Sequence, residues 1–321
     1  MKAAVYDDYG GPEVLRYEDV APPVCHPKGV LIRVEAISIE GGDLLNRSGS
    51  LPNINAAPFV GGRQAAGEVV EVGDQVTEFV VGQRVVATAV RGSHAELFAA
   101  PARTTWRIPD RLDAAAAAAI PVAFGTAQEA LFRYGGFTEG QMVLVRGGAG
   151  GVGVAAIQMA QAAGAALVVA TGSSDERLER LKAFGMNVGI NHRREQLAER
   201  IMTLTEGRGV DLVVDPVAGA GLQQCIHALA RGGRVVMCGQ ASREPALADL
   251  ASLMERNAAV AGFALDIASP RVHRAIAELL EDCASGRYRV IIDRIFPLAE
   301  AAAAHAYAES RQAVGRILLK P

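Results

Sequence analysis

The pattern of apolar and polar positions changes character about a third of the way along the chain. Over the first hundred residues, short segments with β-branched residues or apolar–polar alternation are separated by glycine and proline, most clearly at 30–36, 67–72 and 83–90. This arrangement is typical of short strands joined by tight turns. It predicts a compact β-rich barrel in this part of the chain.

From about Pro121 onward, apolar segments that suit strands alternate with segments that suit helices. Strands are predicted at 142–145, 167–170, 188–190, 210–214 and 234–238, and helices at 152–163, 175–184, 195–205 and 222–230. Such alternation is typical of βαβ units, in which helices cover both faces of a parallel sheet. A helix at 271–285 and a strand at 316–319 follow, and the alanine runs 114–119 and 301–304 are also predicted to be helical.

Glycine is the unusual feature of the composition. The chain has 35 glycines in 321 residues, and only 5% of its residues are aromatic. We therefore expect a core of Ala, Val, Leu and Ile, with tight backbone turns in many places. The places where these glycines lie become the main question.

Charge and cysteine content exclude several classes of protein. The chain has 32 Lys and Arg against 35 Asp and Glu, a net charge of −3, so no nucleic-acid partner is expected. It has no uncharged apolar run of about 18 residues and no signal-peptide pattern at its start, so no membrane partner is expected. Its four cysteines are far apart and form no CxxC pair. They predict ordinary thiols in a reducing, cytoplasmic compartment.

A cluster of glycines lies between a predicted strand and a predicted helix. It consists of Gly147, Gly148, Ala149, Gly150, Gly151, Val152 and Gly153. Glycines at this position allow the backbone to turn tightly and approach a pyrophosphate, and the helix that follows presents free N–H groups to the anion. The cluster therefore predicts a dinucleotide site, and the alternative is a tight turn without a ligand.

The end of the next predicted strand indicates which dinucleotide is bound. Thr171 and Ser173 stand where an NAD site usually has an acidic residue, and Arg177 follows four residues after Ser173. A hydroxyl and a guanidinium suit a 2′-phosphate, so NADPH is the expected cofactor. The alternative is that Asp175 binds the ribose of NADH, although its position better suits the first turn of a helix.

With these motifs in view, nearly the whole chain resembles the medium-chain dehydrogenase/reductase superfamily. It is most similar to the zinc-free quinone oxidoreductase branch, the zeta-crystallin-like proteins. The resemblance implies an α/β fold in which a GroES-like β-barrel catalytic domain, 1–121 and 265–321, carries a Rossmann doubly wound parallel sheet, 122–264. The cofactor would then lie in the cleft between them. The stretches that carry the resemblance are 62–69, 147–153 with 155–160 behind it, 211–217 and 304–311.

The family pattern implies further cofactor-binding residues. Ser173, Arg177, His192 and Arg311 match positions around the 2′-phosphate. His192 stands where a tyrosine is usual, and its alternative interpretation is an exposed loop histidine. The positions that match those near the nicotinamide are Thr126, Gly239 and Gln240, although Gly239 also suits a simple strand-to-loop turn.

The same resemblance implies that no metal is bound. Zinc enzymes of the superfamily carry a metal-binding cysteine, which falls at Glu40, and a Gly-His-Glu motif, which here reads Gly62-Arg63-Gln64. The thiolate and imidazole ligands that zinc requires are both missing. The cofactor would then supply the difficult chemistry by passing a hydride to an electron-poor acceptor.

Two carboxylates are the candidate catalytic residues that line the acceptor pocket. Glu40 replaces an asparagine of the family pattern. It is a proton donor if burial raises its pKa, a partner of Arg63 that holds the shape of the pocket, or an exposed loop carboxylate. Asp43 is expected to order the loop rather than to catalyse.

These observations predict an NADPH-dependent, zinc-independent reductase of quinones. The alternatives are an enone, alkenal or enoyl double-bond reductase, and a non-catalytic NADPH-binding protein with a sensing, structural or RNA-binding role. The partner is therefore expected to be a small electron acceptor, either a quinone or an enone. An apolar strand at 258–263 is expected at the edge of the sheet, where pairing with a second copy would make a homodimer.

Overall fold

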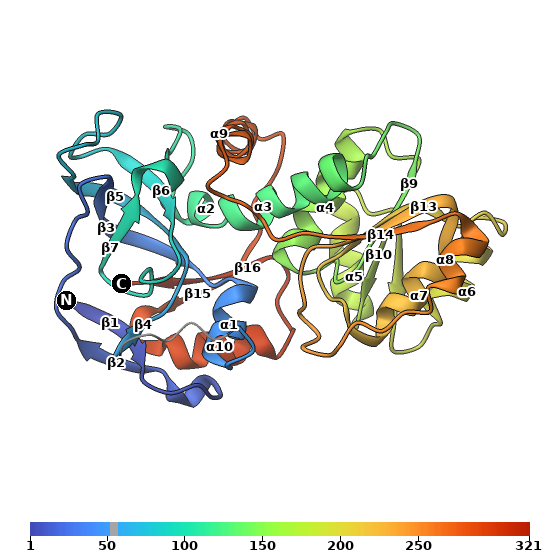
Figure 1. The fold of residues 1–321 in the computed structure, drawn as a ribbon, viewed down its shortest axis with the longest axis horizontal. Helices are drawn as coiled ribbons and strands as arrows, with labels where there is room; N and C mark the ends of the chain where they lie inside the picture. Colours follow the sequence, from blue (N-terminus) through green and yellow to red (C-terminus); the bar gives the residue numbers. More distant parts are fainter. Residues whose placement is uncertain (52–56) are drawn as a thin grey trace. The chain divides into compact units, whose positions relative to one another are not determined.

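The computed structural model describes residues 1–51 and 57–321. Within it the chain forms two compact units, of which the first comprises residues 1–122 and 266–321 and the second residues 123–265 (Figure 1). The first unit contains two sheets and the second contains one, and each unit has its own helices.

The first unit is built from two sheets that are largely antiparallel. The larger sheet has the order β15 (Ile292–Pro297), β16 (Arg316–Lys320), β3 (Gly29–Ser38), β5 (Gln64–Val72), β6 (Arg84–Thr88) and β8 (Thr105–Arg107), and β7 (Leu97–Pro101) also pairs with β3. Strands β2 (Arg16–Asp19), β1 (Lys2–Tyr6) and β4 (Phe59–Val60) form the smaller sheet. The strands predicted at 30–36, 67–72 and 83–90 are confirmed as β3, β5 and β6.

Alternation along β3 and β5 places one face of the larger sheet in the core of this unit. Val30, Ile32 and Val69 are buried in the same cluster as Val85 of β6 and Phe98 of β7. Both alanine runs form helices as predicted: α2 (Ala114–Ala118) covers 114–119 except its last residue, and α10 (Ala301–Glu309) contains 301–304. The other helical segments of the unit are η1 (Pro12–Val14), α1 (Gly41–Arg47), η2 (Ala102–Thr104), α9 (Pro270–Ala284) and η6 (Leu298–Glu300).

The second unit is a parallel sheet of six described strands. Its order is β11 (Val188–Asn191), β10 (Leu167–Gly172), β9 (Met142–Val145), β12 (Val210–Asp215), β13 (Leu229–Met237) and β14 (Ala259–Gly262), and every neighbouring pair is parallel. The chain runs outward from β9 to β11, then returns to the other side of β9 at β12. This order confirms the predicted doubly wound sheet, and its switch point lies at β9.

Helices cover both faces of this sheet. Helices α6 (Leu197–Leu204) and α7 (Leu222–His227) bury their apolar side chains in one cluster with Leu144 and Val169 of the sheet. Ala170 points the other way, toward α4 (Gly151–Ala162) and α5 (Asp175–Leu181). The remaining helical segments are α3 (Pro121–Gln128), which enters this unit from the first, η3 (Glu129–Tyr134), η4 (Lys182–Phe184), η5 (Gly219–Gly221) and α8 (Ala251–Arg256).

One predicted boundary in this unit is wrong. The helix expected at 222–230 ends at His227, and β13 begins at Leu229, which pairs with Val210 of β12. Leu229 and Ala230 are buried and apolar, so they satisfy the hydrophobic pattern of a helix and of a central strand equally well. Pairing with β12 decides between the two.

Among the described strands, β14 lies at the end of the sheet and pairs with β13 alone. This confirms the edge position predicted for 258–263. None of the described helices is long and apolar enough to cross a membrane.

We expect substitution of Gly153 by alanine to destabilise the second unit by about 1–3 kcal/mol. A Cβ at Gly153 would lie 2.5 Å from the carbonyl oxygen of Gly147 and 2.7 Å from Cα of Gly148, and neither backbone atom can yield cheaply. G150A is the matched control, because its Cβ meets only Gly147 O at 3.4 Å, and it should cost less than about 1 kcal/mol. Urea denaturation of both variants measures the difference, and equal losses would contradict this packing argument.

Candidate functional site

The glycine-rich loop begins where β9 ends, at the switch point of the sheet. Gly147 has a φ of +59°, a conformation that side chains other than glycine rarely adopt. Thr171, near the end of β10, is hydrogen-bonded to the loop. Its hydroxyl accepts a hydrogen bond from Gly147 N at 3.1 Å, and its carbonyl accepts one from Gly148 N at 2.9 Å. Thr171 is buried, so the structure places this predicted cofactor residue under the loop, where it positions the backbone.

The loop leads directly into α4. Gly150 is the N-cap of this helix, and its amide donates to Gly147 O at 2.9 Å, which closes the turn. The helix begins at Gly151, one residue before the predicted start. Its first amides have no acceptor within the helix and carry the positive end of its dipole. A glycine turn at a switch point, followed by a twelve-residue helix, fits a pyrophosphate.

A buried ion pair beside this loop was not predicted from the sequence. Arg146 Nη1 donates to both carboxylate oxygens of Asp215, at 2.9 and 2.8 Å, and also to Ala218 O at 2.9 Å. Arg146 follows β9 and Asp215 ends β12, so the pair joins the carboxyl ends of the two central strands. Both residues follow apolar strand segments, which was the available signal, but nothing local identifies one as the partner of the other.

Three of the residues predicted to surround a 2′-phosphate come together at the ends of β10 and β11. Arg177 Nη2 donates to Ser173 Oγ at 2.8 Å, and the amide of His192 donates to Gly172 O at 3.0 Å. His192 lies in an exposed turn, a position that suits both interpretations given above. The alternative residue, Asp175, accepts hydrogen bonds from Asn191 Nδ2 and Arg194 Nη1.

The remaining predicted cofactor residues lie on other elements of the chain. Gly239 and Gln240 are exposed at the carboxyl end of β13, and a Cβ at Gly239 would lie 2.6 Å from the carbonyl oxygen of Pro216. Thr126 is buried on α3. Arg311 belongs to the first unit, where it follows α10 with a φ of +56°.

In the first unit, Glu40 is buried and forms an ion pair with Arg316 of β16. The guanidinium of Arg316 also donates to Ser38 Oγ at 2.7 Å and to Ile39 O at 2.6 Å, and Gln64 Nε2 lies 3.4 Å from Glu40 Oε1. Two of the three interpretations of Glu40 are therefore wrong: it is not an exposed carboxylate, and its ion-pair partner is Arg316 rather than Arg63. Burial raises the pKa of Glu40, and the charge of Arg316 opposes that rise.

Asp43 lies one turn further along α1 and is also buried. Its Oδ2 accepts a hydrogen bond from Glu40 N at 2.8 Å, so it orders the start of the helix as expected. Burial, with some repulsion from Glu40, raises the pKa of Asp43 to about 7. This carboxyl group therefore exchanges its proton near neutral pH.

Two histidines that the sequence did not single out pack near Asp43. His94 Nε2 lies 3.9 Å from Asp43 Oδ2, which is too long for a hydrogen bond, and its ring meets that of His305 edge-on with centroids 5.2 Å apart. Burial lowers the pKa of His94 to about 4 and that of His305 well below its usual value. Both rings are therefore neutral at pH 7 and leave the acidity of this region to the carboxylates.

The side chains at the positions that match zinc ligands do not fit a zinc ion. Glu40 is bound to the guanidinium of Arg316, and Gln64 donates to Ala118 O and accepts from Val122 N at 2.9 Å. The Glu40 carboxylate is thus already paired with a positive charge, so it would not attract a zinc ion. Across residues 1–51 and 57–321, no group of three or more His, Cys, Asp or Glu side chains is arranged to hold a metal.

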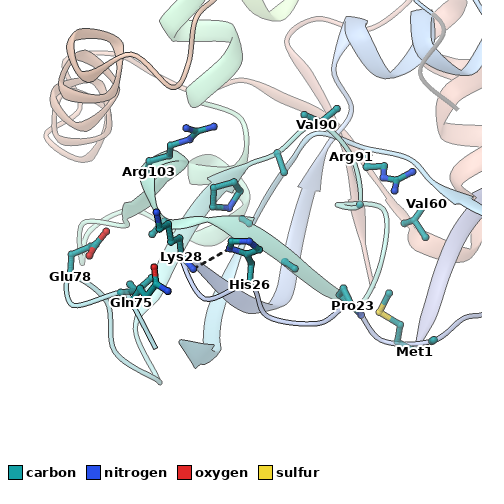
Figure 2. Close-up of a pocket in the computed structure, with 18 of the residues that line it drawn as sticks. Met1, Pro23, His26, Lys28, Val60, Gln75, Glu78, Val90, Arg91 and Arg103 are labelled. Carbon is teal, nitrogen blue, oxygen red and sulfur yellow. Dashed lines mark hydrogen bonds between the residues drawn. The ribbon is translucent and has the colours of Figure 1, made fainter. Parts of the chain in front are cut away.

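A pocket of about 980 Å³ lies elsewhere in the first unit. Figure 2 shows His26, Lys28, Gln75, Glu78 and Arg103 toward one end of it and residues that include Met1, Val60 and Arg91 toward the other. Its described lining contains none of the predicted catalytic or cofactor residues. We therefore place the candidate chemistry at the glycine loop and at the Glu40–Asp43 region instead.

With this geometry established, two family models match the chain. Residues 26–110 match the alcohol dehydrogenase GroES-like domain, and residues 151–281 match a domain described as zinc-binding dehydrogenase. The first match lies in the β-rich unit and confirms the predicted GroES-like fold. The second begins within the glycine loop and covers β10 to β14 of the doubly wound sheet.

Whole proteins match over almost their full length. The quinone oxidoreductase of Sus scrofa is 32% identical over 99% of this chain and 97% of its own. A mycobacterial structure complexed with NADPH has a TM-score of 0.94 at 31% identity, and the Escherichia coli quinone oxidoreductase complexed with NADPH has one of 0.93 at 27% identity; each covers 100% of both chains. The chain therefore belongs to the quinone oxidoreductase family of the medium-chain dehydrogenase/reductase superfamily.

Proposed function

We propose that this protein is an NADPH-dependent reductase that transfers a hydride to a quinone without a metal. The observation that carries the proposal is the arrangement at the carboxyl edge of the parallel sheet. There a glycine loop suited to a pyrophosphate lies one strand away from the Ser173–Arg177 pair, which suits a 2′-phosphate. The two structural neighbours solved with NADPH support the same cofactor.

The preference for NADPH over NADH follows from the charges at the end of β10. Arg177 offers a guanidinium, which binds a phosphate through two parallel hydrogen bonds. Asp175, the residue that an NADH site would use, is occupied by Asn191 and Arg194. A ribose hydroxyl would meet a carboxylate whose charge Arg194 already balances, whereas a phosphate finds donors already in place.

The reaction converts a quinone, NADPH and one proton into a hydroquinone and NADP⁺. NADPH, when bound, supplies the hydride that the acceptor receives. The chain holds the cofactor through the glycine loop and the Ser173–Arg177 pair. We infer that Asp43 holds a proton near the acceptor, since burial keeps its pKa close to neutrality.

We also propose that the protein forms a homodimer through β14. This strand ends the sheet with one side unpaired, and an uncovered edge invites pairing with a second copy. Light scattering at micromolar concentration should give twice the chain mass of 33.6 kDa, and a monomer would contradict the proposal.

All four cysteines are free thiols, which supports a reducing, cytoplasmic location.

The proposed function is tested by following NADPH absorbance with a panel of quinones and enones. We expect oxidation with quinones, and a kcat/KM for NADPH at least tenfold above that for NADH. Activity with enones alone would move the assignment to a double-bond reductase. Binding of NADPH without oxidation by any acceptor would indicate a sensor or structural protein.

In the same assay, replacing Arg177 tests the phosphate site. R177Q should raise the KM for NADPH by about tenfold or more and change that for NADH little, because only the 2′-phosphate loses a charged donor. K182Q is the matched control, since Lys182 is an exposed cation paired with Glu179 that follows the same helix. Equal effects of R177Q on both cofactors would exclude Arg177 as the phosphate ligand.

The raised pKa of Asp43 predicts a pH dependence of stability. The folded protein holds this proton up to about pH 7, whereas the unfolded chain releases it near pH 4, so wild type loses stability as pH rises between these values. D43N keeps an acceptor for Glu40 N and does not titrate. As pH rises between these values, the free energy of unfolding of D43N relative to wild type should therefore increase by about 1.4 kcal/mol for each pH unit, as measured by urea denaturation. E35Q, at an exposed site on β3, is the control, and parallel wild-type and D43N profiles would contradict the prediction.

A further inference from the structure

Arg63 is a half-buried cation that none of the roles described above uses. It lies in the bend between β4 and β5, where its carbonyl accepts a hydrogen bond from Ala89 N at 2.9 Å. The preceding Gly62 has a φ of +84°, and a Cβ there would overlap the side chains of Ser93 and His94. The backbone path is thus tightly determined, and the side chain of Arg63 starts from a fixed point.

The guanidinium of Arg63 packs against the first turn of α1. A Cβ placed on Gly42 would lie 3.3 Å from Arg63 Nε and 3.5 Å from its Cδ. Nε is buried, yet it has no hydrogen-bond partner within residues 1–51 and 57–321. An unsatisfied buried donor is costly, so packing against α1 rather than hydrogen bonding holds this part of the side chain in place.

The two carboxyl groups on which the charge of Arg63 acts, those of Glu40 and Asp43, are hydrogen-bonded to other groups. Glu40 Oε1 is bound by Ser38 and Arg316, and Asp43 Oδ2 accepts from the backbone of Glu40. The charge of Arg63 acts on both carboxyls, but it forms an ion pair with neither in the described part of the chain. Within the described part of the chain, Arg63 thus has no carboxylate in direct contact, and Glu40 and Asp43 balance its charge only at longer range.

A half-buried guanidinium that no described carboxylate contacts directly is suited to one kind of ligand. Carboxylate and sulfonate groups accept two parallel hydrogen bonds from it, whereas a neutral carbonyl accepts less and leaves the charge unbalanced. The ordinary alternative is a solvated arginine, which would leave its donors in water. Packing of Nε and Cδ near Gly42 instead holds the guanidinium in one position beside α1.

We propose that Arg63 binds an anionic group of the acceptor, so that the protein prefers acceptors with a carboxylate or sulfonate close to the reducible carbonyl. This inference rests on the proposed function, because it places the acceptor beside Glu40 and Asp43. It deepens that function by naming the class of acceptor.

The test compares 1,4-naphthoquinone-2-sulfonate with the neutral 2-methyl-1,4-naphthoquinone. The ratio of their kcat/KM values should fall about tenfold or more in R63Q, because the anionic acceptor alone loses a charge-assisted contact. R63K should retain part of the ratio, since lysine keeps the charge without the planar fork. R33Q removes an exposed guanidinium of the same unit and should leave the ratio unchanged.

Two neighbouring glycines supply a finer control. G42A would crowd Arg63 Nε, whereas a Cβ on Gly41 meets nothing within 4 Å. We expect G42A to lower the sulfonate preference and G41A to leave it as it is. Because both changes add one methyl group to the same helical turn, a general effect on α1 would appear in both variants.

Calorimetric binding of 1,4-naphthoquinone-2-sulfonate to the whole protein with NADP⁺ separates this inference from the proposed function. A Kd that rises about tenfold in R63Q supports the anion site even if no quinone is reduced, in which case only the proposed function fails. Equal losses for both quinones, or an unchanged Kd in both R63Q and R63K, would overturn the inference.

Discussion

The buried pair of Glu40 and Arg316 holds together the part of the first unit where an acceptor would bind. It joins the end of β3 to β16 across 276 residues of sequence. Removing one partner of such a pair typically costs about 3–5 kcal/mol, because the other charge is left uncompensated in a poorly solvating interior. The pair therefore fixes where α1 begins, and with it the positions of Asp43 and of the surface on which Arg63 packs.

The two candidate sites differ in the source of their positive charge. In the second unit the backbone provides the positive end: amides at the start of α4 and a loop held by Thr171 need no charged residue to attract a pyrophosphate. In the first unit the charges are on side chains, and burial makes each of them costly unless another group compensates it. Cofactor binding can thus rely on a local motif, while the acceptor side depends on contacts between distant segments.

This difference explains how much of the protein could be predicted from its sequence. The order of strands and helices in the second unit and the glycine loop follow from local patterns, and the structure agrees with them apart from the end of α7. The Ser173–Arg177 contact spans four residues and was within reach of spacing arguments. Arg316 was not, because no local rule links a residue of the last strand to Glu40. Arg63 was the partner considered from the sequence, and the fold brought a different cation into contact.

The pairing of Glu40 with Arg316 also limits the chemistry that the first unit can offer an acceptor. A bound metal would polarise an acceptor carbonyl as a Lewis acid, but Glu40 and Gln64 are already committed to Arg316 and to the backbone. A guanidinium instead offers fixed charge and directed hydrogen bonds, which favour groups that are anionic before the reaction starts. Asp43, whose pKa burial raises to about 7, lies in the same first turn of α1 as Gly42, against which Arg63 packs. A carboxyl group and a positive charge thus lie beside the same short segment. If the proposed roles hold, this arrangement would link the choice of acceptor to the protonation of its product.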